Sequence, residues 1–150
     1  MLFDLLSTDS DWIQTAVRVI LGVIFFAHGA QKLLGWFGGP GLSVSLRGMR
    51  ESLGVPAPLA LLAIATEFLG GLALVAGLFS RIAAVGIGIT MLCAIPLAHG
   101  RYGLFLNWFG DRKGDGYEYH LLAIALAAVV VARGSGAVSL DRLLSMWIGA

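Results

Sequence analysis

The chain has 150 residues, of which 58% are hydrophobic and 13% are charged, and its formal net charge is +1. Soluble proteins contain roughly 45–50% apolar and about 25% charged residues, so this composition excludes an ordinary soluble domain. The small net charge gives no indication of nucleic-acid binding. The single cysteine, Cys93, excludes an internal disulfide and a cysteine-based zinc site.

Most of the sequence consists of hydrophobic segments, which occur in the order Trp12–Gly35, Ala57–Phe79, Ile82–Ala98 and Tyr117–Ala132. A helix of about 20 apolar residues crosses a hydrocarbon layer of about 30 Å. Its backbone groups must be hydrogen-bonded within the helix, because lipid offers no partners. The fourth segment is the shortest, and we expect it to span as well. The sequence therefore predicts one domain over residues 1–150, an all-α polytopic membrane protein built as a four-helix bundle.

Two amphipathic stretches accompany these segments. In the first, which follows the first span, apolar residues recur every three or four positions: Leu42, Leu46, Met49 and Leu53. The second lies near the C-terminus, and its apolar side consists of Leu140, Leu143, Leu144 and Trp147. We expect both stretches to form helices that lie at the membrane interface.

Three histidines belong near the same end of the predicted bundle. Successive spans alternate in direction, so the end of the first, the start of the second, the end of the third and the start of the fourth share one membrane face. His28, His99 and His120 all fall near that face, and Pro96 should kink the third helix one turn before His99. Ionisable groups gathered at one depth of a membrane protein indicate binding or chemistry there.

Glu67 lies near the middle of the second span, where an ionised carboxylate is costly and is usually paired or functional. Two interpretations stay open. Arg18 of the first span pairs with Glu67 and fixes the helix register, or Glu67 exchanges protons with a ligand seated beside His28. In the second case the positive charge of Arg18 tunes the acidity of Glu67.

Further candidates follow one stripe of the first span. The stripe consists of Arg18, Gly22, Phe25, Gly29 and Lys32, and His28 shares the face of Lys32. Its glycines let a neighbouring helix or a flat ligand approach closely. We therefore name Glu67 and His28 as candidate catalytic residues. The candidate ligand-binding residues are Lys32, Arg18, His120 and Trp36.

These side chains suit a quinone or a similar flat, apolar ligand with hydrogen-bonding oxygens. Such a ligand requires an apolar slot, a histidine or lysine donor, and an acid for proton exchange. Haem held by His28 and His120 is the alternative cofactor; quinone is favoured because the sequence holds no short ligand motif. No metal site is predicted. Lys32 and His28 also have plainer interpretations, as a lysine extending to the headgroups and a histidine bonded to backbone.

The run from Arg18 to Leu33, with Phe37–Gly41 after it, resembles the opening of the DoxX family of small bacterial membrane proteins. The similarity continues in order over nearly the whole chain, through residues Glu67–Gly71, Gly77–Arg81, Glu118–Leu122 and Ser139–Asp141. It implies a DoxX-like four-helix transmembrane domain that is a multi-pass protein of the bacterial inner (plasma) membrane. The recurrent polar positions that it implies are Arg18, His28, Lys32, Glu67, Arg81 and His120.

The resemblance also implies an association with membrane oxidoreductase assemblies and with quinone detoxification. We expect an integral membrane component of a redox system that binds its ligand in a polar pocket inside the bundle, and whether it is itself an enzyme subunit stays open. The alternatives are a non-catalytic anchor or scaffold for an oxidoreductase complex, and a small transporter. Electrons require a partner subunit or an unseen cofactor, because no nucleotide or flavin motif is visible. Homo-oligomers are compatible with the glycine stripes, membrane orientation stays open, and Cys93, expected to be buried, provides no thiol relay.

Overall fold

The computed structural model describes residues 5–111 and 113–148, and within these ranges every regular element is helical. The elements in chain order are α2 (Trp12–Leu34), η1 (Trp36–Gly38), α3 (Gly41–Leu53), α4 (Ala57–Ala76), α5 (Ser80–Ala94), η2 (Ile95–His99), η3 (Gly100–Tyr102), α6 (Glu118–Arg133) and α7 (Leu140–Ile148). The all-α prediction is confirmed for this part of the chain.

Among the described residues, three helices are long and apolar enough to cross a membrane: Trp12–Leu34, Ala57–Ala76 and Ser80–Tyr102. They correspond to the first three predicted spans, and the third includes η2 and η3. The fourth predicted segment forms α6, whose 16 residues fall just short of the range of about 17–25 for a spanning helix. Its crossing of the membrane stays a prediction.

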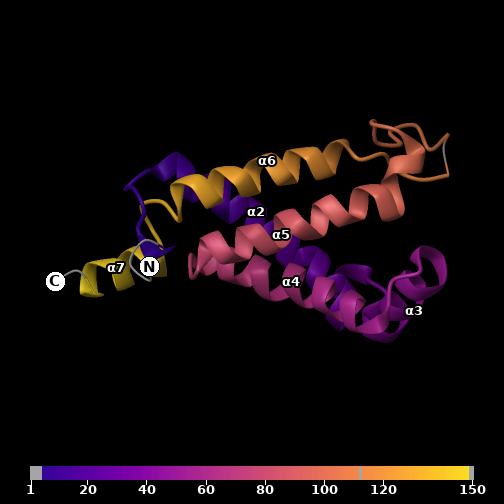
Figure 1. Ribbon diagram of the computed structural model, residues 1–150, viewed down its shortest axis with the longest axis horizontal. Helices are drawn as coiled ribbons and strands as arrows, with labels where there is room; N and C mark the ends of the chain where they lie inside the picture. Colours follow the sequence, from indigo (N-terminus) through magenta and orange to yellow (C-terminus); the bar gives the residue numbers. More distant parts are fainter. Residues whose placement is uncertain (1–4, 112, 149–150) are drawn as a thin grey trace.

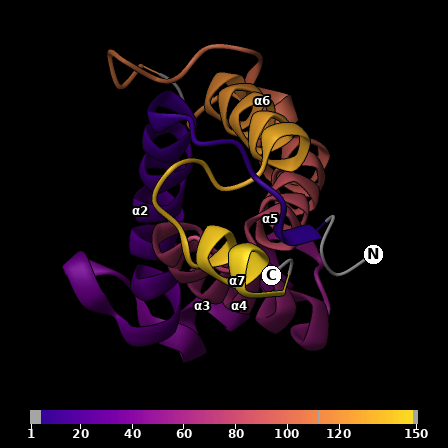
Figure 2. The same cartoon turned by 90° about the vertical axis from the view of Figure 1, so that its left-hand side faces the viewer.

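The four long helices pack around one apolar core. α2 contacts α4 and α6, and α5 contacts the same two helices, so that the four enclose the core when the molecule is seen from its end (Figure 2). α3 and residues 103–111 and 113–117 lie at one end, called here the loop end, whereas α7 lies at the other, called the termini end (Figure 1). The core side chains include Leu21, Phe25, Leu74, Ile87, Met91 and Val130.

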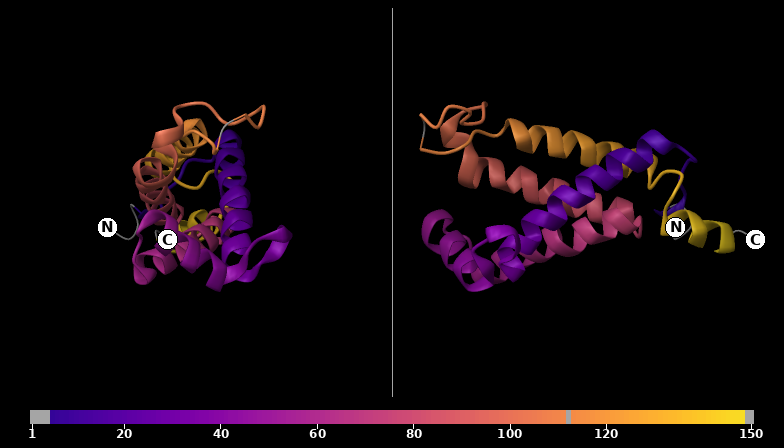
Figure 3. Two further views of the ribbon diagram at one scale, coloured as in Figure 1. Left: turned by 90° about the vertical axis from the view of Figure 1, so that its right-hand side faces the viewer. Right: turned by 180° about the vertical axis from the view of Figure 1, so that it is seen from behind.

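Glycines bring α2 and α4 into direct backbone contact. A Cβ atom added to Gly29 would stand 2.3 Å from the amide nitrogen of Phe68, and one added to Gly71 would stand 2.2 Å from that of Phe26. No real side chain tolerates such distances, so the small residues are required by the crossing of the helices. Of the two partners predicted for the glycine stripe of α2, a helix or a flat ligand, the structure places a helix there, α4. α2 itself crosses the molecule diagonally (Figure 3).

The third span changes its helical form before it ends. Residues Ile95–His99 make a π-helical turn, at the place where Pro96 lacks the amide proton that an α-helix would use. The distortion predicted before His99 is thus present as a widened turn. Cys93, expected to be buried, is exposed because it lies on the outer side of α5, whereas Met91 faces the core.

The two predicted amphipathic helices are present as α3 and α7, but their position at a membrane interface stays a prediction. In α3 the apolar residues Leu46 and Met49 are half-buried and Arg47 is exposed, as the pattern predicts. α7 extends beyond the end of the long helices, and its axis follows the long axis of the molecule rather than crossing it (Figures 1 and 2). Its apolar residues, including Leu143 and Trp147, are exposed.

A buried polar network closes the termini end. Arg18 is 1% exposed, and its guanidinium donates to the backbone carbonyls of Ser135 (2.7 Å), Val138 (2.6 Å), Val75 (3.0 Å) and Leu74. These carbonyls belong to the C-terminal turn of α4 and to the link between α6 and α7. Arg18 thus satisfies helix-end acceptors that would otherwise be unpaired in a buried setting.

Asp141 ties α7 to the start of α5. Its carboxylate accepts hydrogen bonds from the backbone amides of Phe79 (2.6 Å) and Ser80 (3.0 Å) and from the hydroxyl of Ser135 (2.5 Å). A carboxylate is favoured at a helix N-terminus, where amide protons are unpaired. Asp141 therefore provides the cap of α5 from a distant part of the chain.

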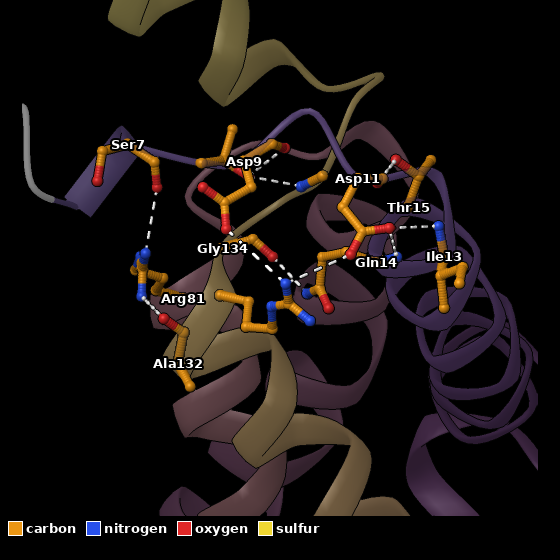
Figure 4. Close-up of polar contacts among 12 residues, drawn as sticks. Ser7, Asp9, Asp11, Ile13, Gln14, Thr15, Arg81, Ala132 and Gly134 are labelled. Atoms are coloured by element: carbon orange, nitrogen blue, oxygen red, sulfur yellow. Dashed lines mark hydrogen bonds and ion pairs between the residues drawn. The ribbon is translucent and has the colours of Figure 1, made fainter.

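The N-terminal segment is fastened to the same end (Figure 4). Asp11 caps α2 by accepting from the backbone amides of Ile13 and Gln14, as expected of an aspartate directly before a helix. The side-chain amide nitrogen of Gln14 donates to the carbonyl of Gly134 (2.6 Å). Arg81 donates to the carbonyls of Ser7 (3.1 Å), Ala132 (3.0 Å) and Val131.

Candidate functional site

A buried carboxylate and a lysine form an ion pair toward the loop end of the molecule. The ammonium nitrogen of Lys32 lies 2.7 Å from Glu67 Oε1 and 2.6 Å from Oε2. Glu67 is 4% exposed, whereas the Lys32 side chain is 36% exposed. An ammonium carries three N–H donors, so two suffice for Glu67 and one stays available toward the exposed side.

The helical geometry explains why Lys32 reaches inward. Side chains on a helix lean toward its N-terminus, and Lys32 lies nearly one turn after Gly29. Gly29 packs directly on the backbone of Glu67 and Phe68, so the lysine side chain leans back to the level of the acid. Lys32 therefore does not simply extend to the headgroups, as its plainer interpretation expects.

Four rings form a continuous series next to this pair. The ring centroids of His28 and Tyr119 are 6.1 Å apart, those of Tyr119 and His120 are 5.7 Å apart, and those of His120 and His99 are 4.1 Å apart. His28 comes from α2, His99 from the π-helical turn, and the other two from the first turn of α6. The predicted meeting of the three histidines at one end is thus observed, with Tyr119 between two of them.

The charges of the ion pair act on these rings. Glu67 interacts electrostatically with both His28 and Tyr119, and Lys32 interacts with His28 and His120. The pair and the ring series therefore belong to one cluster. We call Lys32, Glu67, His28, Tyr119, His120 and His99 the polar cluster.

Two polar atoms of the cluster are buried without a hydrogen-bond partner. They are the hydroxyl of Tyr119 and Nδ1 of His120. His120 is only 6% exposed, which agrees with the inward orientation expected from the sequence. Buried polar atoms are normally paired, so these two unpaired atoms indicate places where a water molecule or a ligand atom is bound.

The cluster is open on one side. His28 is exposed, although its ring contacts that of Tyr119, because it lies at the edge of the buried stripe that passes through Phe25 and Gly29. Glu67 and His120, by contrast, are buried. The cluster therefore extends from the buried interior to an exposed edge at His28, and the interior pocket expected from the sequence stays a prediction.

Arg18 and Trp36, predicted as ligand-binding residues, lie away from the cluster. Arg18 is ten residues before His28, about 15 Å along the helix, and donates to carbonyls at the termini end. The predicted ion pair of Arg18 with Glu67 is wrong, since Glu67 pairs with Lys32. Trp36 packs edge-on against Phe26 (centroids 6.5 Å apart), and Phe26 and His28 are about 200° apart around α2.

Sequence reasoning missed Tyr119 and Asp141. Tyr119 is next to the inward-pointing His120 in the sequence, and only the histidines were interpreted as candidate site residues. Asp141 lies in a stretch interpreted only by its apolar side.

Within the described residues, no three histidine, cysteine, aspartate or glutamate side chains come together as a metal-ligand set. A separate groove of about 490 Å³ lies at the termini end, lined by residues of α2, α4 and α7 that include Val75 and Met146.

The apolar helices and the buried ion pair define a class, the helical membrane proteins that carry a charged site among their spans. The chain matches the DoxX family model over residues 13–100, more than half of its length, and it belongs to the DoxX family. The family resemblance inferred from the sequence is thereby confirmed.

Three curated relatives are similar to this chain. "Putative oxidoreductase CatD" of Bacillus subtilis is 37% identical over 79 residues, which are 53% of this chain and 54% of that protein. "Inner membrane protein YqjF" of Escherichia coli is 30% identical over 129 residues, 85% of this chain and 88% of that protein. An uncharacterised protein of Haemophilus influenzae is 30% identical over 128 residues, 84% of this chain and 86% of that protein. No protein of solved structure matches significantly.

Proposed function

We propose that this protein is a multi-pass component of a redox system in the bacterial inner membrane, with α6 as the fourth span of a four-helix bundle. We further propose that it binds a quinone, or a similar flat apolar ligand, at the open side of the polar cluster. The observation that carries the proposal is the half-exposed ammonium of Lys32, held by the buried Glu67 near the exposed His28.

The chemistry of the cluster suits a ligand that enters sideways from lipid. The third N–H of Lys32 and the ring of His28 can each donate to a carbonyl oxygen of the head group. The half-buried ring of Tyr119, with its centroid 6.1 Å from that of His28, offers an aromatic wall for a flat ring. The isoprenoid tail of such a ligand would stay in the lipid phase.

Glu67 would act through Lys32 rather than on the ligand itself. Reduction of a quinone to a quinol takes two electrons and two protons, and the electrons would come from a partner subunit. Lys32 would donate a proton to one ligand oxygen and recover it from the surroundings, while Glu67 keeps the ammonium in position. His28 would donate the second proton, to the other ligand oxygen. This assigns Glu67 a positioning role and His28 a role in direct contact.

Binding of soluble quinones tests the proposal. Purified protein in lipid nanodiscs is titrated with decylubiquinone and with menadione, and bound isoprenoid quinone is sought by mass spectrometry of a lipid extract. We expect saturable binding that His28→Ala weakens by about tenfold, the loss of one hydrogen bond to a charged or polar donor.

The matched control is Ile20→Ala, which removes an exposed side chain from the same helix away from the cluster. It should bind as the wild type does. Protein that neither retains quinone nor binds either probe, with His28→Ala indistinguishable from wild type, excludes the proposal.

A non-catalytic anchor for an oxidoreductase complex is the second candidate, and α7 favours it. This helix projects from the termini end with Leu143, Met146 and Trp147 exposed on it, a surface suited to a protein partner. Replacement of Leu143, Met146 and Trp147 by serine, which leaves Asp141 in place, would then release the partner subunit from purified complexes while quinone binding at the loop end persists.

A further inference from the structure

We propose that Tyr119, His120 and His99 form a hydrated proton pathway that connects the Lys32–Glu67 pair to the aqueous phase at the loop end. The proposal rests on the proposed function in one respect, since the pathway supplies the protons that a ligand beside Lys32 would consume. It does not require that this ligand is a quinone.

The two unpaired atoms mark the inner part of the pathway. The hydroxyl of Tyr119 and Nδ1 of His120 are buried without partners on neighbouring residues, and the two rings lie 5.7 Å apart. A buried water needs two to four polar partners, and these atoms provide an acceptor and a donor. Water bound at each atom would remove both unpaired groups and continue a chain of hydrogen bonds toward Glu67 and His28.

The outer part of the pathway is the pair of histidines. Nδ1 of His99 lies 2.9 Å from the backbone carbonyl of Asp115. A carbonyl only accepts, so Nδ1 carries a proton and Nε2 is the nitrogen that can take up another. With ring centroids 4.1 Å apart, His99 and His120 are close enough to exchange a proton through one water.

The protons balance along this route. His99 takes one proton from water at the loop end and becomes an imidazolium, then releases one to His120 and becomes neutral again. His120 and the water beside the Tyr119 hydroxyl repeat the exchange toward the pair. Each group gains one proton and loses one, so a single proton moves inward. Because His120 takes up the proton on one ring nitrogen and releases it from the other, a turn of its ring restores the starting tautomer.

The loop end is the source of protons, because apolar packing closes the other direction. The buried side chains of Leu21, Phe25 and Leu74 lie between the cluster and the termini end, where the guanidinium of Arg18 is already bound to four carbonyls. At the loop end, Asp115 is exposed.

Other charged groups face this route from the elements around it. Lys32 and Glu67 lie at its inner end with His28 beside them, and Glu118 lies at its outer end, where it accepts from the amide of Leu106 (3.1 Å). The route therefore begins and ends beside acidic side chains, which favour a proton in transit.

Exchange of the ammonium protons of Lys32 with water measures the pathway without any ligand. The chain contains two lysines, Lys32 and Lys113, and Lys113 is exposed in the loop. In lysine-labelled protein in nanodiscs, the protected ammonium signal therefore belongs to Lys32. Its water-exchange rate is measured by nuclear magnetic resonance in the wild type and in Tyr119→Phe, which keeps the ring and removes the hydroxyl.

We expect Tyr119→Phe to slow the exchange by about tenfold or more, as loss of a proton-transferring group does, with the Lys32–Glu67 pair still formed. Tyr102→Phe is the matched control, because Tyr102 stacks under Arg101 in the loop outside the pathway, and it should exchange at the wild-type rate. His99→Gln, a change at a half-buried position, should slow the exchange as well and serves if Tyr119→Phe fails to fold.

An unchanged exchange rate in these variants overturns the pathway, since Lys32 would then reach water directly along its exposed side. That result would leave quinone binding untouched, because binding is measured separately with His28→Ala. Absence of quinone binding by the wild type, together with slowed exchange in Tyr119→Phe, would instead refute the ligand while retaining the pathway.

Discussion

Lys32 has two environments within reach, the headgroup region at the end of α2 and the buried carboxylate of Glu67. It bonds to both oxygens of Glu67, and the acid is thereby stabilised at a depth where an unpaired charge would be costly. Removal of one partner from such a pair leaves the other charge uncompensated, whereas removal of both does not.

We therefore expect Lys32→Met to lower the free energy of unfolding by about 3 kcal/mol. The double variant Lys32→Met with Glu67→Gln should recover most of that loss. Thermal unfolding in detergent measures both. Equal damage in the single and double variants would show that the two side chains do not depend on each other.

At the termini end the buried acid is Asp141, whose carboxylate accepts hydrogen bonds from two backbone amides and one hydroxyl. Asp141→Ala should lower the free energy of unfolding by about 2 kcal/mol, because hydrogen bonds to a charged group are lost and their donors stay buried. Asp9→Ala is the control, since its exposed pairing with Arg133 spans 4.0 Å and should contribute under about 1 kcal/mol. Similar unfolding temperatures for the two variants would contradict the capping role.

The contact between α2 and α4 follows from the positions of small residues along both helices. The predicted inner stripe of α2 is buried at Arg18, Gly22, Phe25 and Gly29, so sequence periodicity identified the correct face. It could not identify the partner of each charged residue. The carbonyls that bind Arg18 belong partly to Ser135 and Val138, 117 and 120 residues away, and no local pattern records such a contact.

The arrangement of the candidate site could be predicted only in part for the same reason. Alternating spans correctly brought His28, His99 and His120 to one end, because helix direction is a property of the whole element. The exposure of His28 depends on its angle from Phe25, and the pairing of Lys32 depends on how closely α4 approaches Gly29. Both are details of packing that only the assembled helices define.

At the scale of the element, Gly29→Ala tests the close approach of α2 and α4. The added methyl group meets the backbone of Phe68 at 2.3 Å, so we expect a loss of about 1–3 kcal/mol through overpacking, together with disturbed Lys32–Glu67 geometry. Gly48→Ala in α3 is the control, because nothing lies within 4 Å of the added atom and helix propensity favours alanine. A tolerated Gly29→Ala would show that the two helices are farther apart.

For the whole molecule, the crossing of α6 determines where the two ends lie. If α6 spans the membrane, residues of the termini end and residues of the loop end are on opposite sides. In a Cys93→Ala background, single cysteines at Ser10 and at Asp111 should react with a membrane-impermeant reagent from opposite faces of sealed vesicles. Labelling of Ser10→Cys and Trp147→Cys from different faces would contradict a fourth span.

The proposed ligand site and the groove near Val75 and Met146 lie at opposite ends of the molecule. The position of a bound ligand therefore distinguishes binding at the polar cluster from binding at the groove. The most direct measurement is cross-linking with a photoreactive quinone in nanodiscs, followed by mass spectrometry of the modified peptides. We predict adducts on residues 28–32 and on Tyr119 and His120 that excess unlabelled quinone suppresses. Adducts confined to the groove at the termini end, or adducts that no competitor suppresses, would contradict the account.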